Sequence, residues 1–229
     1  MKVLSIDWDF LVDASADYRC MNFPDCCNEN YSEFIQNTIW STRYLYGSLR
    51  EVDVDKDALT EVKNYIGRTC SLHTRGIAYD SHKHIYDEVK RSLSPEEPLV
   101  IVNFDFHHDC YQNGNTVDCG NWVDYLYKDR TTPSGSRLKH STGSSYTWVS
   151  RDDSDDAGIP KYVRRLTINQ VSSLPEIDNF DLLYICKSPM WSPPHLDREY
   201  EDFITWINKY ITDVNDLGSK PRNINLYTG

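Results

Sequence analysis

The chain lacks long apolar runs and lacks a surplus of positive charge. None of its apolar segments approaches the roughly 20 residues that a membrane-spanning helix requires, so no membrane partner is expected. The chain has 24 Lys and Arg and 35 Asp and Glu, which gives a formal net charge of -11. Because clustered Lys and Arg bind phosphate backbones, this balance argues against a nucleic-acid partner. A cationic substrate is the natural complement of so acidic a chain.

Paired cysteine motifs are also missing. The seven cysteines are an odd number, and their spacing includes neither a CxxC nor a zinc ribbon. The first ten residues, MKVLSIDWDF, carry two carboxylates where a signal peptide would have its apolar centre. We therefore expect reduced thiols and a cytoplasmic protein.

Strand and helix signals alternate along the chain. Short apolar runs predict strands at 2–7, 98–104, 163–168 and 180–186. Helical spacing of apolar residues predicts helices at 31–46, 57–68, 82–93, 119–127 and 192–210. This alternation predicts one α/β domain over 1–229, a three-layer α/β/α fold with a mainly parallel sheet.

Two stretches carry weaker patterns. Residues 14–30 are rich in turn-forming residues and predict no regular element. Residues 130–160 are polar and rich in Gly and Ser, with a strand-like island at 146–149. A loop this long inside a domain is commonly functional, so 130–160 is predicted as a loop or lid insertion.

The most informative motif follows the strand at 98–104. Asp105, His107 and Asp109 stand at alternate positions, so in extended backbone their side chains project from one side. Carboxylates that converge after a buried strand repel one another and are costly to desolvate unless a cation neutralises them. Oxygen ligands with some imidazole suit manganese. The pattern predicts a divalent metal site.

Three further residues extend this set. Asp7 and Asp9 follow the first strand at alternate positions, and His82 opens the helix upstream of Asp105. In a parallel sheet the carboxyl ends of the strands meet at one edge. Four carboxylates and two imidazoles are an inventory that fits two metal ions sharing carboxylate ligands, and therefore metal-assisted hydrolysis. Asp7 within Asp-Trp-Asp-Phe also resembles the nucleophile of haloacid-dehalogenase-type phosphatases, which remains an alternative.

Taken together, these motifs resemble the arginase/agmatinase (ureohydrolase) superfamily. Its binuclear manganese enzymes carry Asp-x-His-x-Asp, matched here by residues 105–109, and Asp-x-Asp, matched by residues 7–9. A Gly-Asp-His-Ser segment is loosely matched by 79–82, and Ser-Gly-Asn by 119–121. Here Asp-x-Asp precedes the other motifs, whereas in ordinary arginases it follows them. The family's guanidinium-binding Glu has no counterpart near 184–189.

The resemblance implies a ligand set for two Mn²⁺ ions. Asp7 and Asp105 would bridge the ions, His82 and Asp109 would serve one, and His107 and Asp9 the other. The motif combination is closest to a divergent branch that includes the peptide arginases, which convert arginine to ornithine within precursor peptides. The implied partner is therefore an arginine-containing precursor peptide.

The remaining expected site residues are catalytic or contact substrate. The resemblance makes Asp109 the carboxylate that orients the nucleophile, and His108, His140 and His195 are possible proton shuttles. Asn121 and Asp118 are expected to contact substrate. Three alternatives stay open beside the peptide arginase: hydrolysis of a small guanidino or amide compound, a phosphatase that uses Asp7, and a metal-binding accessory protein without turnover.

Overall fold

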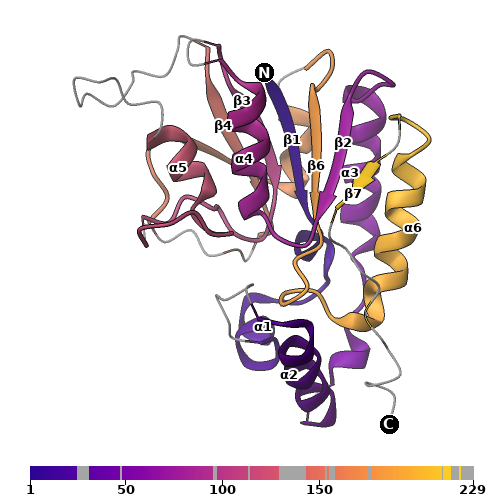
Figure 1. Ribbon diagram of the computed structural model, residues 1–229. Coiled ribbons are helices and arrows are strands. Elements are labelled where there is room, and N and C mark those ends of the chain that lie inside the picture. Colours follow the sequence, from indigo (N-terminus) through magenta and orange to yellow (C-terminus); the bar gives the residue numbers. More distant parts are fainter. Residues whose placement is uncertain are drawn as a thin grey trace.

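A seven-stranded parallel sheet forms the centre of the computed structural model, in the order β5-β4-β3-β1-β6-β2-β7 (Figure 1). The structure describes residues 1–24, 31–46, 48–94, 97–112, 114–128, 143–152, 154, 158–174, 177–212, 214–217 and 222. The strands are β1 (Lys2–Asp7), β2 (Arg75–Tyr79), β3 (Val100–Phe104), β4 (Ser145–Ser150), β5 (Val163–Thr167), β6 (Leu182–Cys186) and β7 (Val214–Asp216).

Helices cover both faces of this sheet, so the fold is the predicted three-layer α/β/α arrangement. The α-helices are α1 (Ala16–Asn22), α2 (Glu33–Tyr46), α3 (Lys56–Thr69), α4 (Lys83–Ser92), α5 (Trp122–Lys128) and α6 (Asp197–Ile207). Short 3-10 helices are η1 (Trp8–Leu11), η2 (Leu49–Glu51), η3 (Ile168–Ser173) and η4 (Pro194–Leu196). None of the helices that the structure describes has the length and apolar character needed to cross a bilayer.

Alternate residues of β1 build the two cores. Leu4 and Ile6 pack in one cluster with the apolar faces of α3 and α6. Val3 packs in the other cluster with Ile85 and Val89 of α4 and with apolar side chains of α5. Because side chains of a strand alternate between faces, Ser5 and Asp7 lie on the same face as Val3, beneath α4 and α5.

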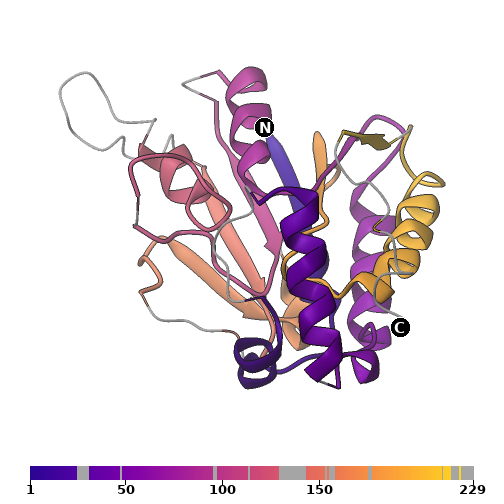
Figure 2. The same ribbon diagram turned by 60° about the horizontal axis from the view of Figure 1, so that its bottom comes forward.

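All strand carboxyl ends lie at one edge of the sheet, since every strand pair is parallel. Figures 1 and 2 show α1 and α2 beyond this edge, so the chain covers it with its own N-terminal helices. The buried indole of Trp40 on α2 donates to the carbonyl of Pro189 at 2.8 Å, which ties α2 to the loop after β6. The helices α1 and α2 therefore cover part of the sheet edge that is predicted to hold the site.

Two sequence predictions are corrected by the fold. The segment 130–160, predicted as a loop or lid, is not one continuous loop: its strand-like island at 146–149 is confirmed as part of the inner strand β4, where Tyr146, Trp148 and Val149 are buried between β3 and β5. Residues 130–142, 153 and 155–157 of that segment lie outside the described residues. The turn-rich stretch 14–30 contains α1, which Ser15 caps by accepting from the backbone N–H of Tyr18.

Candidate metal centre

Three chain segments, 7–9, 82 and 105–109, meet at the carboxyl edge and carry the charged residues. Asp7 ends β1, Asp9 lies in η1, and Asp105 directly follows β3. His82 is the N-cap residue of α4, three residues after β2 ends. The register pairs Ser5 of β1 with Asn103 of β3, so the ends of these two neighbouring strands bring Asp7 and Asp105 close together.

The first group surrounds one nitrogen of His82. Its Nδ1 lies 3.2 Å from Asp7 Oδ2, 3.1 Å from Asp105 Oδ2 and 3.1 Å from Asp109 Oδ2. One ring N–H cannot donate a good hydrogen bond to three carboxylates at once. Ligand atoms that share one divalent cation lie about 3 Å from one another, because each is held about 2.1 Å from the ion. The spacing therefore fits a metal ion at this position.

The second group is formed by Asp9, Asp105 and His107. His107 Nδ1 lies 3.5 Å from Asp9 Oδ2 and 3.9 Å from Asp105 Oδ1, and the ligand atoms lie within 4.8 Å of one another. Both carboxylate oxygens of Asp9 are buried and accept no hydrogen bond from the described residues. A buried carboxylate without donors is costly, and a cation would satisfy it. Asp105 belongs to both groups.

Burial and charge perturb the titration of these residues. Burial, followed by the charge of Asp109, raises the pKa of Asp105 from 3.8 to about 6. Burial and the charges of Asp9 and Asp105 raise the pKa of Asp7 well above its ordinary value. Burial alone would lower the pKa of His82, but the surrounding carboxylates, Asp7 first, raise it well above its ordinary value. The cluster thus retains protons when no metal neutralises it.

Neighbouring strands supply a hydrogen-bond partner for two of these residues. Ser5 Oγ lies 2.9 Å from Nε2 of His82, which leaves Nδ1 for the carboxylates. Asn103 Nδ2 donates to Asp105 Oδ2 at 3.2 Å. Groups of this kind fix the orientation of metal ligands in proteins.

Side chains outside the strands donate hydrogen bonds to Asp109 and Asp7. The indole N–H of Trp122 donates to Asp109 Oδ2 at 2.5 Å, and the hydroxyl of Ser188 donates to Asp7 Oδ2 at 2.6 Å. Asp109 and Ser188 have positive φ, 54° and 47°, and they are the non-glycine residues of the described chain in this region of backbone space. Such conformations cost free energy and persist where surrounding structure enforces them, commonly at functional sites.

Access to the cluster is from the side of His107. Its side chain is 26% exposed, whereas the side chains of Asp7, Asp105 and Asp109 are 6% exposed or less. The ring of Trp191, in the loop after β6, lies 5.0 Å from the imidazole of His107. A third grouping adds a thiol on the enclosed side, since Cys186 of β6 lies near Asp7 and His82. The structure thus brings together all six residues predicted as metal ligands, in groups that could hold a metal ion.

Three histidines were predicted as possible proton shuttles, and the two that the structure describes lie outside the metal-binding groups. His108 is fully buried against Tyr111, its ring centroid 4.1 Å away, and its Nδ1 accepts from the backbone N–H of Cys110. His195 is fixed between the hydroxyl of Tyr44 and the carbonyl of Val52. His140 lies outside the described residues. Neither described histidine belongs to the metal-binding groups, so a shuttle role for them stays a prediction.

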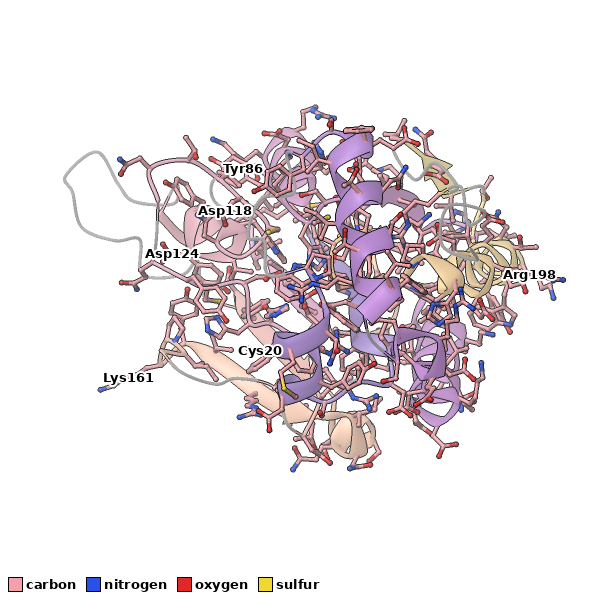
Figure 3. The ribbon with its side chains drawn as sticks, turned by 90° about the horizontal axis from the view of Figure 1, so that it is seen from below. Cys20, Tyr86, Asp118, Asp124, Lys161 and Arg198 are labelled. Carbon is pink, nitrogen blue, oxygen red and sulfur yellow. The ribbon has the colours of Figure 1, made fainter. Side chains whose placement is uncertain are left out.

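The residues expected to contact substrate form the turn before α5. Asn121 is fully buried; its Oδ1 accepts from the N–H of Asp118, and its Nδ2 donates to the carbonyl of Thr116. Asp118 accepts from the N–H of Gly120. Figure 3 views the carboxyl edge from below, with Asp118 and Asp124 labelled to one side of Cys20 on α1. These contacts show that the pair shapes the turn that carries Trp122; contact with substrate stays a prediction.

The sequence contained a signal for two of the supporting residues. Ser5 and Asn103 each interrupt an otherwise apolar strand, VLSI and VIVNF, and a buried polar side chain needs a partner. Trp122 and Ser188 gave no such signal, because their contacts depend on loops that only the fold brings together.

Comparison of the chain with known protein families, with curated proteins and with solved structures finds no match.

Proposed function

We propose that this protein is a binuclear manganese hydrolase that converts arginine side chains within a peptide to ornithine and releases urea. The observation that carries the proposal is the pair of overlapping Asp and His groups that share Asp105, together with the buried carboxylate of Asp9 that accepts no hydrogen bond from the described residues. The motif resemblance to ureohydrolases supports the choice of reaction, and the acidic composition supports a cationic substrate.

Each ion would have a defined ligand set. One would be held by His82, Asp109 and the shared Asp105, with Asp7 3.2 Å from the same His82 nitrogen. The other would be held by Asp9, His107 and Asp105. Such an oxygen-rich set with one imidazole for each ion suits Mn²⁺.

The reaction adds the oxygen of water to the guanidinium carbon and breaks the bond from this carbon to the side-chain nitrogen. Both protons of this water end on the departing nitrogen, so the products are an ornithine ammonium group and neutral urea. Two divalent cations, when bound, would supply Lewis acidity and would make water a nucleophile at neutral pH. The protein contributes by holding Asp109 through the indole N–H of Trp122 and by burying Asp9, while His107 is partly exposed.

The substrate side chain would enter beside His107 and Trp191. An indole face binds a guanidinium by cation–π attraction and covers the apolar stem of an arginine side chain. The ring of Trp191 lies 5.0 Å from that of His107, the partly exposed member of the cluster, and is therefore placed to guide this group. Trp191→Ala should then raise KM more than it lowers kcat.

The test combines metal loading with a mass-spectrometric assay. Metal-free protein is titrated with Mn²⁺, and the loaded protein is incubated with arginine-containing peptides, free arginine and agmatine while ornithine residues and urea are measured. Turnover of peptides alone supports the proposal. Turnover of free arginine or agmatine alone would instead establish the small-guanidine alternative.

Two further outcomes separate the remaining alternatives. Release of phosphate from an aryl phosphate with Mg²⁺, abolished by Asp7→Asn, would establish the phosphatase. Binding of two Mn²⁺ ions without turnover of any guanidino or amide substrate would favour a metal-binding accessory protein. The surface variant Asp53→Asn is the matched control, because it removes a carboxylate that pairs with Lys56 outside the cluster.

A further inference from the structure

Arg19 of α1 is a buried arginine fixed by backbone carbonyls. Its side chain is 3% exposed. Its Nε donates to the carbonyl of Ala14 at 2.9 Å, and its Nη2 donates to the carbonyls of Asp9 and Val12, both at 2.8 Å. These carbonyls belong to the segment between the end of β1 and the start of α1. The guanidinium therefore joins this segment to α1 and cannot move without breaking several hydrogen bonds.

The same guanidinium contacts the segment that carries His107. Its Cζ lies 4.0 Å from the ring centroid of Phe106, the residue between Asp105 and His107. A guanidinium at this distance is attracted to the face of an aromatic ring. Arg19 thus contacts both chain segments that supply the second metal-binding group, one through Asp9 and one through Phe106.

Arg19 lies close to the carboxylate of Asp9 without forming a tight ion pair. Its Nη1 is 3.9 Å from Asp9 Oδ2, whereas a charge-assisted hydrogen bond would need about 2.8 Å. The carbonyl bonds hold the guanidinium at this longer distance. The positive charge therefore partly balances Asp9, while both carboxylate oxygens keep their lone pairs for another cation.

The two metal-binding groups consequently differ in charge. Asp7, Asp105 and Asp109 converge on His82, and in the described part of the chain no Lys or Arg forms an ion pair with them. Asp9 instead has a fixed guanidinium beside it. Because like charges repel strongly in a buried site, a divalent cation would be bound less tightly beside Arg19.

We propose that Arg19 is a positioning residue that makes the two metal positions unequal, so that the position formed by Asp9, Asp105 and His107 fills second and empties first. This inference rests on the proposed two-ion centre. It adds that occupancy of the second position, and with it activity, follows the available concentration of the divalent cation.

Two substitutions of Arg19 separate its charge from its geometry. Arg19→Gln removes the charge and keeps an amide donor for a carbonyl, so it should tighten the second Mn²⁺ dissociation constant by about tenfold and leave the first unchanged. Arg19→Lys keeps the charge but loses the planar fork, which frees the ammonium to pair directly with Asp9. It should weaken the second constant by about tenfold.

Isothermal titration of the metal-free full chain with MnCl₂ measures both constants, and circular dichroism confirms that each variant is folded. Arg165→Gln is the matched control and should change neither constant, because Arg165 stacks on Trp148 and bonds to Ser150 on β4. Should Arg19→Gln fail to fold, Arg19→Lys still carries its own expected result.

The outcomes distinguish this inference from the proposed function. Two ions with opposite shifts in the Gln and Lys variants support the role of Arg19. Two ions in the parent protein, with a second constant that Arg19→Gln leaves unchanged or weakens, overturn the inference alone. A parent protein that binds a single ion overturns both the inference and the two-ion centre.

Discussion

Replacing Asp105 by Asn should abolish metal binding and at the same time stabilise the metal-free protein. Asp105 belongs to both metal-binding groups, so an uncharged amide at this position weakens both. Its carboxylate accepts from the backbone N–H of His107 at 2.8 Å and from Asn103 Nδ2 at 3.2 Å. An Asn side chain has the same shape and keeps an oxygen for one of these donors, so the fold should persist.

The expected gain in stability of the metal-free protein follows from the raised pKa of Asp105. Burial, with the charge of Asp109, raises this pKa from 3.8 to about 6, so ionisation of the carboxyl at pH 8 costs the folded state about 3 kcal/mol. The amide removes this cost and forfeits one hydrogen bond, worth about 1 kcal/mol. A net gain of about 2 kcal/mol corresponds to a rise in Tm of roughly 4–8 °C for a chain of this size.

The assay is thermal unfolding at pH 8, first with a chelator and then with MnCl₂, beside calorimetric titration of the metal. The Tm of the parent protein should rise when Mn²⁺ is added. The Tm of Asp105→Asn should be higher than that of the parent in chelator and should not change when Mn²⁺ is added. Asp53→Asn, on the surface, should behave like the parent. An Asp105→Asn protein that binds Mn²⁺ with the parent's stoichiometry and affinity would refute the shared-ligand reasoning.

Two further predictions concern the support and the titration of the cluster. Trp122→Phe replaces the buried indole with a smaller ring and loses the N–H that donates to Asp109, so Mn²⁺ affinity should fall by about 10–100-fold and Tm should fall as well, measured by calorimetry and thermal unfolding. An unchanged affinity would remove Trp122 from the support of the site. In chelator, the parent protein should lose stability as pH rises from about 4 to 6. Burial raises the pKa of Asp105 to about 6, so over this window the folded chain holds protons that the unfolded chain has released. The raised pKa of His82 extends the loss above pH 6.5, and a Tm that increases with pH over this range would contradict the cluster's protonation.

The alternation of strands and helices was predictable because it depends on local patterns. Apolar runs such as VIVNF specify buried strands of a parallel sheet, and helical spacing of Val62 and Ile66 specifies α3. Two local patterns misled. The Ser- and Gly-rich surroundings of 145–150 led to a loop or lid over 130–160, although the island at 146–149 has a strand pattern, because the buried position of β4 between β3 and β5 is a property of the sheet. No strand was predicted at 75–79, because β2 is only five residues long with a glycine in it.

The metal-binding residues were predictable for a different reason. Asp105, His107 and Asp109 are unusual side chains directly after an apolar run, and burying them without a cation is costly wherever the fold places them. Their convergence with Asp7 and His82 followed from the rule that parallel strands end at one edge.

The fold class and the chemical character of this edge were thus predictable from local patterns, because hydrophobic periodicity and the cost of buried charge act on neighbours in the chain. Which polar groups support the cluster depends instead on contacts between distant segments. Trp122 reaches Asp109, Ser188 reaches Asp7 and Arg19 lies beside Asp9 through loop conformations, two of them with positive φ, at Asp109 and Ser188. Such contacts depend on distances across the sheet edge, and no local pattern of residues encodes these distances.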